Sequence, residues 1–382
     1  MSTLAGHFDA IRVVAAQVPS NASRGEMPGN VELSAAIPGG RGQLVRESFR
    51  RSGALRESMI IFLRDLRHVT GVRTLQRLVF ATLRGRLVAL RIRDVLDEDA
   101  WSDARVYFFW GAWGAYAMPW LEGEAATISV RFHGGDLYVE RSGGYMPFRR
   151  SIFRRADRIL TVSAHGRDYI AEQGCSEGAG GEGKVVLAPL GSPDLGLGPV
   201  PDGGGLQVVS CSAVDQNKRV GLILAGLKLL AEVGVEVRWT HFGDGPEMAA
   251  LRQDAGDLPE GLTVELRGRT PRDEILAFYQ ETPVDVFVNA SRSEGAPVSI
   301  MEALSFDIPV AAPAVGGIPG MLPRDSSLGV VFSADSDADD VASAIHRAAG
   351  LRTVGPGARR THWEKHFDAH TNSTIVAELL GP

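Results

Sequence analysis

From residue 206 onward the sequence alternates between short apolar runs and longer amphipathic stretches. The apolar runs that read as strands are 206–212, 236–242, 263–267, 284–289, 310–312 and 329–332. Helical patterns fill most of the intervals, at 218–232, 247–254, 273–281, 298–304 and 339–349. Strands that alternate with helices form a parallel sheet with helices on both faces. The sequence therefore predicts a doubly wound α/β domain, in which ligands bind at the carboxyl ends of the strands.

The earlier part of the chain shows a similar but less regular pattern. Residues 105–110, 127–132 and 158–162 are apolar runs followed by turn or helix residues, as in a parallel sheet with crossover helices. A last strand is expected at 184–187. It lies inside the stretch 174–205, where 11 of 32 residues are glycine, a density typical of a flexible hinge.

These patterns divide the chain into two Rossmann-like domains with a cleft between them. We expect an N-terminal domain over 1–190, a hinge over 191–205, a C-terminal domain over 206–355, and a C-terminal helix over 356–382 that returns to the N-terminal domain. The opening residues 4–14 read as the end of a helix followed by a strand.

A strongly basic segment interrupts the first domain. Residues 41–93 contain 13 arginines, no lysine and three acids, a net charge of +10 within a chain whose net charge is −6. Apolar residues recur there at helical spacing, at 59, 60, 63 and 66 and again at 75, 78, 79 and 83, which predicts two or three amphipathic helices. One interpretation is a solvated basic face whose apolar side packs on a sheet. The other is a surface that contacts anionic membrane lipids.

Other classes of protein are excluded by composition. Cys175 and Cys211 are the only cysteines, too few for a disulfide framework or a structural zinc site. The acidic net charge argues against nucleic acid as a partner. No signal peptide and no apolar run long enough to span a bilayer is recognised, so a cytoplasmic location, at most peripheral to a membrane, is expected.

The most informative stretch is 288–304, where a strand ends, a polar loop carries Glu294, and a helix begins near Ala296 or Pro297. Free N–H groups at a helix start favour a phosphate or a sugar hydroxyl. Glu294 and Glu302 stand eight residues apart, and carboxylates of this kind can accept hydrogen bonds from sugar and ribose hydroxyls. Without further context, the pair could equally be a capping residue and a solvated helix residue.

This block resembles the E-x7-E motif of family-four retaining glycosyltransferases, whose fold is GT-B, with two Rossmann-like domains facing across a cleft. The resemblance implies that Glu294 contacts the donor sugar and Glu302 the nucleotide ribose. It also implies that the amides of Gly295, Ala296 and Val298 face the donor sugar and its phosphates.

Further matches lie outside that motif. Residues 210–220 resemble the strand, loop and lysine that grip the diphosphate, with Ala213 in place of the usual arginine, so that Lys218 and Arg219 supply the positive charge. Residues 240–246 and 267–269 are similar to the strand ends beside the nucleotide base, which assigns Gly243, Gly268 and Arg269 to donor binding. Residues 315–319 resemble the family's Gly-Gly turn.

In the first domain, residues 129–138 resemble the colanic-acid and exopolysaccharide subgroup of the same family. His133 matches the position that contacts the donor sugar, and Gly134, Gly135 and Asp136 follow it on the acceptor side. Ser163 is expected at the next strand end, with His165 a weaker candidate. The family's first strand and glycine-rich loop have no counterpart at the start of this sequence, which departs from the family pattern there.

The resemblance implies a metal-independent, retaining hexosyltransferase without a cofactor, in which His133, Lys218 and Glu294 are the catalytic residues. The donor would be a UDP- or GDP-sugar, and the acceptor a saccharide, a lipid-linked sugar or a small glycoside, in polysaccharide or glycoconjugate biosynthesis. Asp335 and Asp337 form an Asp-x-Asp that helix capping explains better than a metal. Two alternatives stay open: a GT-B epimerase or hydrolase of nucleotide sugars, and a non-catalytic partner subunit.

Overall fold

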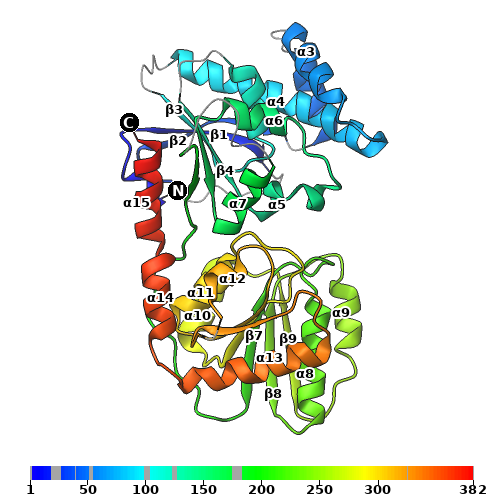
Figure 1. The fold of residues 1–382 in the computed structure, drawn as a ribbon, viewed down its shortest axis with the longest axis vertical. Coiled ribbons are helices and arrows are strands. Elements are labelled where there is room, and N and C mark those ends of the chain that lie inside the picture. Colours follow the sequence, from blue (N-terminus) through cyan, green and yellow to red (C-terminus); the bar gives the residue numbers. More distant parts are fainter. Residues whose placement is uncertain are drawn as a thin grey trace. The chain divides into compact units, whose positions relative to one another are not determined.

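The structure is a computed structural model that describes residues 2–18, 27–38, 40–50, 55–98, 104–122, 127–173, 183–324 and 326–381. The chain forms two compact units (Figure 1). The first comprises Met1–Ala188 with Ser373–Pro382, and the second comprises Pro189–Asn372. Each unit contains its own parallel sheet, so the α/β class expected from the sequence is confirmed.

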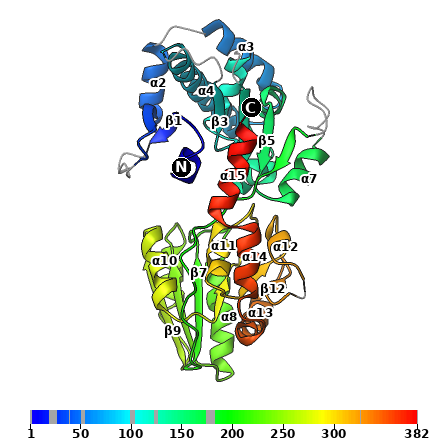
Figure 2. The ribbon, with the colours of Figure 1, turned by 90° about the vertical axis from the view of Figure 1, so that its left-hand side faces the viewer.

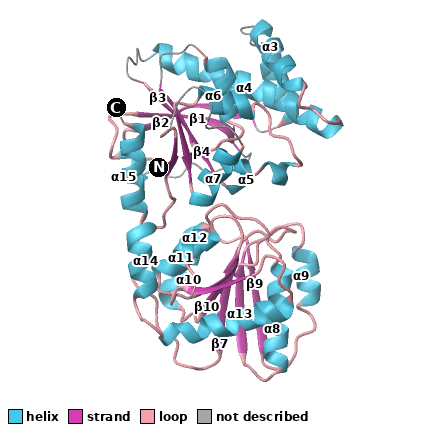
Figure 3. Ribbon diagram, in the orientation of Figure 1, coloured by secondary structure: helices cyan, strands magenta, loops and turns pink. Residues whose placement is uncertain are grey.

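The second unit is built on a six-stranded parallel sheet in the order β12-β11-β10-β7-β8-β9 (Figure 3). Its strands are β7 Leu206–Cys211, β8 Val237–Phe242, β9 Leu262–Gly268, β10 Val286–Val288, β11 Val310–Pro313 and β12 Gly329–Phe332. After β9 the chain crosses to the other side of β7 and continues as β10. The strand order therefore reverses between β7 and β10, and such a switch point is where open α/β sheets bind ligands.

Helices cover both faces of this sheet, because successive strand residues point to opposite sides. Val208 packs with α8 and α13, whereas its neighbour Val209 packs with α10 and α11. Figure 1 labels these helices around the strands of the second unit. The helices are α8 Val220–Glu232, α9 Met248–Asp254, α10 Arg272–Glu281, α11 Val298–Ser305, α12 Ile318–Met321, α13 Ala338–Gly350 and α14 Ala358–His366. A 3₁₀ turn, η3, follows at Leu351–Thr353, and α15 spans Ala369–Leu380.

The first unit has a four-stranded parallel sheet, β3-β4-β5-β6, and a separate parallel pair, β1-β2. The strands are β1 Ile11–Val18, β2 Val31–Pro38, β3 Arg105–Phe108, β4 Thr127–Phe132, β5 Arg158–Thr161 and β6 Val185–Leu187. The helices are α1 Ser2–Ala5, α2 Arg41–Arg50, α3 Leu55–Leu66, α4 Val72–Glu98, α5 Gly134–Leu137, α6 Arg149–Arg155 and α7 Ala164–Glu172, with 3₁₀ turns η1 Ala115–Leu121 and η2 Val139–Ser142. Val376 and Leu380 of α15 pack against Leu160 and Ala188 in this unit.

The arginine-rich segment forms three helices, α2, α3 and α4, as the periodicity predicts, with 51–54 outside the described residues. Figure 2 shows α4 between α3 and the strands of the first unit. The expectation that the apolar side of these helices packs on a sheet is wrong for α3, where Met59, Ile60 and Leu63 are 59%, 44% and 55% exposed. Periodicity reveals an apolar face but not whether anything covers it.

The sequence also predicts a hinge over 191–205 and a helix that begins near Ala296 or Pro297. Residues 189–205 contain no helix and no strand beyond one isolated bridge, Ser192 with Asp368, while 174–182 of the glycine-rich stretch lies outside the described residues. The helix expected near Ala296 begins at Val298, because Pro297 is extended. Within the described part of the chain, no helix is both long enough and apolar enough to cross a membrane.

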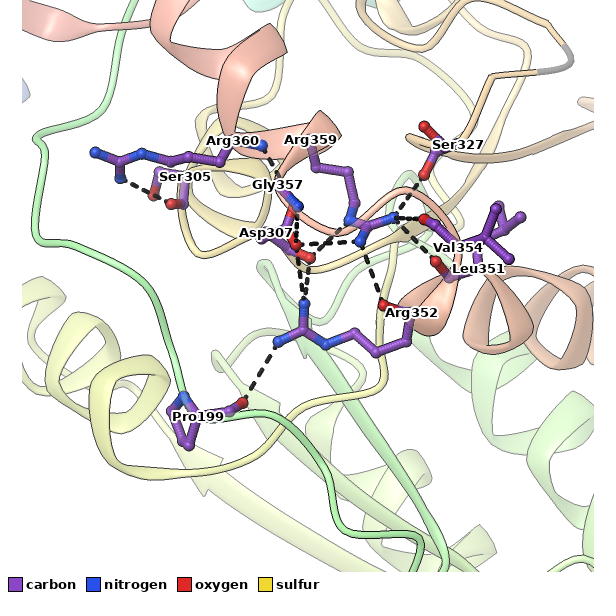
Figure 4. A network of polar contacts seen from close by, with 10 residues as sticks. All are labelled: Pro199, Ser305, Asp307, Ser327, Leu351, Arg352, Val354, Gly357, Arg359 and Arg360. Carbon is purple, nitrogen blue, oxygen red and sulfur yellow. Dashed lines mark hydrogen bonds and ion pairs between the residues drawn. The ribbon is translucent and has the colours of Figure 1, made fainter.

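A buried carboxylate in the turn between α11 and β11 ties together several segments of the second unit (Figure 4). The main-chain carbonyl of Asp307 accepts hydrogen bonds from the guanidinium groups of Arg352 and, at 2.7 Å, Arg359. Its carboxylate accepts from Arg359 at 3.1 Å and from the main-chain N–H of Gly357 at 2.9 Å. The side chains of Asp307, Arg352 and Arg359 are only 8%, 6% and 0% exposed, so the negative charge offsets two buried positive ones.

We expect Asp307→Asn to lower the free energy of unfolding of the second unit by about 3–5 kcal/mol, because it leaves two buried guanidinium groups without their counter-charge. Asparagine also tolerates the left-handed backbone at this position, φ 60°, so the variant tests the charge rather than the turn. Urea denaturation followed by tryptophan fluorescence measures the change, since Trp239 and Trp363 lie in this unit.

The matched control is Asp194→Asn, which removes a carboxylate that is 56% exposed and contacts Arg360 at 2.6 Å. Exposed pairs contribute about 1 kcal/mol or less. Equal unfolding midpoints for the two variants would contradict a central role for Asp307.

Candidate functional site

Two loops of the second unit meet at the switch point of its sheet. One follows β7 and carries Lys218, and the other follows β10 and carries Glu294. Because β7 and β10 are hydrogen-bonded neighbours, the loops at their carboxyl ends lie side by side although 76 residues separate these two side chains. Chain topology alone thus brings a lysine and a glutamate into contact.

Lys218 and Glu294 form an ion pair, with Nζ and Oε1 2.5 Å apart. The carboxylate is 9% exposed, and the same oxygen also accepts hydrogen bonds from the Ser291 hydroxyl at 2.6 Å and the Asn289 amide at 3.3 Å. Three donors on one oxygen fix the orientation of Glu294. They also leave its other oxygen, Oε2, without a hydrogen bond among the described residues.

Asp215 positions the lysine. Its carboxylate and its main-chain carbonyl both accept hydrogen bonds from the main-chain N–H of Lys218, at 2.9 and 3.1 Å. An aspartate that bonds to the backbone a few residues ahead makes a tight local turn. The turn holds Lys218 immediately before α8.

Arg219 connects the same two loops through the backbone. Its Nε donates to the carbonyl of Ala290 at 2.6 Å. Burial lowers the pKa of Arg219, and the nearby Arg292 lowers it further while Asp335 raises it. One terminal nitrogen of the guanidinium is buried without a hydrogen-bond partner among the described residues, so it retains a free donor next to the Lys218 loop.

A glycine turn closes the site from a third strand end. Gly316, which follows β11, has φ 52°, and a Cβ placed there would lie 1.8 Å from the carbonyl oxygen of Glu294. Only glycine allows the two backbones to approach this closely. The Glu294 loop is therefore held by side chains on one side and by the backbone of this turn on the other.

The start of α11 presents unused donors beside Glu294. The main-chain N–H groups of Gly295, Ala296 and Val298 find no acceptor among the described residues. Val298 is the first residue of α11, and Gly295 and Ala296 lie in the loop just before it. Gly295 is buried, and Ala296 and Val298 are half-buried. Unpaired N–H groups at a helix start can bind an anion.

Glu302 lies one turn further along α11 and is 6% exposed. It accepts a hydrogen bond from Nε of Arg272 on α10 at 2.7 Å. Burial raises the pKa of Glu302, and the Arg272 contact offsets part of that rise. Burial, with Glu302 adding to the effect, also raises the pKa of Cys211 to about 11, so this neighbouring thiol stays protonated near neutral pH.

Gly243 and Gly268 lie at the carboxyl ends of β8 and β9. The N–H of Gly243 donates to the carbonyl of Gly268 at 2.8 Å. A Cβ at Gly243 would lie 1.7 Å from the carbonyl oxygen of Ser212, so this position also requires glycine. Arg269, the next residue, is exposed.

The site residues expected in the first unit are organised around Asp136. Its carboxylate, 4% exposed, accepts hydrogen bonds from the main-chain N–H groups of His133 and Gly111, both at 2.6 Å. His133 follows β4, and Gly134 and Gly135 begin α5. Ser163 caps α7, with its hydroxyl accepting from the N–H of Gly166 at 3.1 Å, and His165 bonds to the hydroxyl of Tyr138.

The structure thus brings Lys218, Arg219, Glu294 and the amides of α11 together within the second unit. Sequence reasoning missed Asp215, Asn289, Ser291 and Arg272. The first could have been found from its spacing three residues before Lys218, but Arg272 reaches Glu302 from a different helix. Asp337 caps α13 by accepting from the N–H of Asp340, as expected, and the described residues hold no cluster of His, Cys, Asp and Glu fit for a metal ion.

Comparisons with known proteins identify the family that the second unit matches and the fold of the chain. Residues 205–350 match the family described as "Glycosyl transferases group 1". The amylovoran biosynthesis glycosyltransferase AmsK of Erwinia amylovora is 27% identical over 277 residues, covering 68% of this chain and 64% of AmsK. The chain therefore spans less than two thirds of the length of the curated relatives it matches first.

Two solved structures show the fold. The apo structure of OtsA aligns with a TM-score of 0.68 at 15% identity, covering 98% of this chain and 99% of OtsA. Anabaena HepE in complex with UDP and glucose aligns with a TM-score of 0.58 at 14% identity, covering 76% and 81%. The chain has the GT-B fold, and its residues 205–350 match the group 1 glycosyltransferase family.

Proposed function

We propose that the chain is a retaining, metal-independent glycosyltransferase that moves a hexose from a UDP- or GDP-sugar to a saccharide, lipid-linked or small-glycoside acceptor. The process would be polysaccharide or glycoconjugate biosynthesis, as for AmsK. The observation that carries the proposal is the contact between Lys218 and Glu294 beside the unpaired amides of α11. This arrangement offers a positive charge and N–H donors to a diphosphate, and a fixed carboxylate to a sugar.

The donor would be held by groups that surround the switch point. An ammonium group has three N–H donors, and only one hydrogen bond of Lys218 goes to Glu294. The other two can face a diphosphate together with the amides of Gly295, Ala296 and Val298. Each charge-assisted hydrogen bond of this kind contributes about 1.5–3 kcal/mol. The free Oε2 of Glu294 would accept from a donor-sugar hydroxyl.

The remaining contacts to the nucleotide sugar would come from residues near the carboxyl ends of the strands. Glu302 would accept hydrogen bonds from the ribose hydroxyls, and Arg219 would add positive charge near the diphosphate. The base would lie against the backbone at Gly243 and Gly268, next to Arg269. The nucleotide in HepE is UDP, which favours testing uridine first.

The chemistry proposed is a transfer on one face of the sugar. As the bond to the diphosphate breaks, negative charge develops on the leaving oxygen, and preorganised donors stabilise that charge most strongly in the transition state. The departing diphosphate then takes the proton from the acceptor hydroxyl, whose oxygen bonds to the anomeric carbon on the same face. His133 would contact the donor sugar.

Two alternatives would use the same nucleotide site. A GT-B epimerase or hydrolase would consume the sugar nucleotide without an acceptor, so the dependence of turnover on acceptor separates it. A non-catalytic partner subunit is favoured by Ala213, which stands where the motif that residues 210–220 resemble has an arginine. Such a subunit would not turn over the donor at all.

We also propose that the first unit binds an anionic lipid surface through α3 and the start of α4. Arg56 and Arg64 on α3, and Arg67 directly after it, are exposed among apolar side chains. The exposed apolar residues of this surface are Leu55, Met59, Ile60, Leu63, Leu66, Val72, Leu75 and Val79. A helical surface that combines arginine with exposed apolar side chains suits the boundary between headgroups and acyl chains. A lipid-linked acceptor would be reached from there.

The first prediction of the proposal concerns nucleotide binding without metal. By calorimetry, we expect saturable binding of UDP or GDP, reduced at least tenfold by Lys218→Gln because a charge-assisted contact to the diphosphate is lost. Lys228→Gln is the matched control, since Lys228 is half-buried on α8 and its ammonium donates to the carbonyl of Asp254. Glu294→Gln should leave UDP binding within about threefold but reduce transfer by orders of magnitude. Normal transfer in either site variant would remove the assignment.

The second prediction concerns pH. If the ionised form of Glu302 binds ribose, affinity persists above its raised pKa and is lost as the pH falls through it. Arg272→Gln removes the contact that lowers this pKa, so the loss should begin at a higher pH than in the unmodified protein. The measurement is the dissociation constant of UDP for Arg272→Gln divided by that for the unmodified protein, from pH 8 to pH 5. Because UDP itself titrates in the same way in both experiments, its titration cancels in this ratio. Arg252→Gln, an exposed change on α9, should leave the ratio flat.

The third prediction concerns lipid binding. In co-sedimentation with vesicles of phosphatidylglycerol and phosphatidylcholine, Met59→Gln combined with Leu63→Gln should reduce binding at least tenfold, because burial of one such side chain contributes about 1.5–3 kcal/mol. Binding should also weaken with salt, as the arginines act through charge. Val233→Gln, at a site 78% exposed in the second unit, is the control. Equal binding by both variants would exclude α3 as the contact.

A further inference from the structure

Arg131 is a buried cation in the sheet of the first unit. It lies on β4, and only 5% of the residue is exposed. Within the part of the chain that the structure describes, no carboxylate forms an ion pair with its guanidinium. Moving a charge out of water is costly unless a counter-charge lies close to it. Burial accordingly lowers the pKa of Arg131, and Tyr107 offsets part of that fall.

The second unit shows what a buried guanidinium ordinarily requires. There Arg352 and Arg359 share the carboxylate of Asp307. Arg131 has a neutral partner instead, the main-chain carbonyl of Ala188, which accepts a hydrogen bond from Nη2 at 3.1 Å. The first unit therefore holds a positive charge that the described residues do not balance.

Two hydrogen-bond donors at this charge are unused. The Nε atom of Arg131 is buried without a hydrogen-bond partner among the described residues, and the same is true of the hydroxyl of Tyr107 on β3, the strand that pairs with β4. Burial raises the pKa of Tyr107, with Arg131 opposing part of the rise, so the hydroxyl keeps its proton near neutral pH. Native proteins keep few buried polar groups without partners, because each one is costly.

The ring of Phe109 lies against both groups. Its centroid is 5.9 Å from the guanidinium carbon of Arg131 and 6.3 Å from the ring centroid of Tyr107. The same ring is 5.1 Å from the imidazole of His133, and Phe109 is 48% exposed. Arg131 and Tyr107 therefore contact a side chain that reaches solvent beside His133.

The free donors indicate the chemistry of a ligand. Nη2 of Arg131 carries two N–H groups, of which one goes to Ala188, and Nε carries another. The N–H groups of Nε and Nη2 point in parallel from one edge of the guanidinium and match two oxygens of a carboxylate or a phosphate. The Tyr107 hydroxyl can donate to the same anion. A neutral ligand could accept these hydrogen bonds but would leave the charge of Arg131 unbalanced.

We propose that Arg131 and Tyr107 bind the anionic group of an acidic ligand, a carboxylate or a phosphate, as the side chain of Phe109 rotates to admit it. The ligand then supplies the counter-charge that the described residues lack. That this ligand is a glycosyl acceptor with an acidic group rests on the proposed function, whereas the binding of the anion does not.

The first experiment compares acidic and neutral ligands by NMR on the full chain, with excess UDP present to occupy the donor site. One arm measures saturation transfer to methyl glucuronide, with methyl glucoside as its neutral counterpart. The other arm measures the phosphorus line width of inorganic phosphate. A response to the glucuronide and not to the glucoside identifies a carboxylate, and line broadening identifies a phosphate.

Three variants test which groups bind the anion. Arg131→Met should weaken its binding by about tenfold or more, because a charge-assisted contact is lost. Tyr107→Phe should weaken it about fivefold, because one neutral donor is lost. Arg105→Met is the matched control and should bind as the unmodified protein does, since Arg105 on β3 is half-buried and donates to the hydroxyl of Thr127 at 2.9 Å.

The second experiment measures stability without ligand, by urea denaturation followed by tryptophan fluorescence. Arg131→Met should keep or raise the unfolding midpoint, because it removes an unbalanced buried charge and retains an apolar side chain. Tyr107→Phe should also keep the midpoint, since the deleted hydroxyl has no partner among the described residues. A lower midpoint for Arg131→Met combined with unchanged anion binding would show that Arg131 only stabilises the fold.

The proposal is overturned if the unmodified protein binds neither anion, or if Arg131→Met binds them equally well. Should Arg131→Met fail to fold, Tyr107→Phe decides, and undiminished anion binding by that variant also overturns the proposal. Calorimetry with UDP is the independent readout. Arg131→Met should keep the UDP affinity of the unmodified protein, so failure of the anion site leaves the donor site of the second unit standing.

Discussion

The buried charge of Asp307 is the interaction on which the second unit depends most. Two guanidinium groups withdrawn from water would each cost several kcal/mol without a counter-charge. Asp307 supplies that charge. Because it lies between α11 and β11, its contacts determine which segments of the second unit are held together. Its hydrogen bond with Arg352 holds the segment at the end of α13, and its hydrogen bonds with Arg359 and Gly357 hold the start of α14. Because α11 ends two residues before Asp307, the network also holds the helix that carries Glu302 and begins beside Glu294.

The geometry of the Lys218–Glu294 site follows from sheet topology as much as from its residues. Lys218 and Glu294 are distant in sequence, and the sequence of one loop does not show that it contacts the other. The reversal of strand order between β7 and β10 makes them neighbours. Once neighbours, the loops are joined by three kinds of contact: the ion pair, the bond from Arg219 to the carbonyl of Ala290, and the bond from Arg292 N–H to the carbonyl of Asn217 at 2.7 Å. A site held in so many ways is preorganised for charge.

Features set by neighbouring residues could be predicted from the sequence, and features set by distant ones could not. The strands of the second unit follow from apolar runs, and the cap at Asp337 follows from acids at the start of a helix. The Asp307 network was not foreseen, because its arginines lie 45 and 52 residues away. Whether the apolar face of α3 is covered could not be decided from the sequence for a related reason, since periodicity does not show what lies opposite that face. The acceptor-side role of Asp136 stays a prediction, and the sequence did not show that its oxygens accept from two main-chain N–H groups.

The key polar side chains of the two units differ in how many hydrogen bonds they make. Glu294 has one oxygen saturated by Lys218, Ser291 and Asn289, so little reorganisation is needed before it can act. His133 is the opposite case, with both nitrogens unpaired beneath aromatic rings. Donors that are already in place stabilise a developing charge without reorganisation, and Lys218 and Glu294 are fixed in this way. His133 instead keeps its full hydrogen-bonding capacity, because neither ring nitrogen has a partner among the described residues.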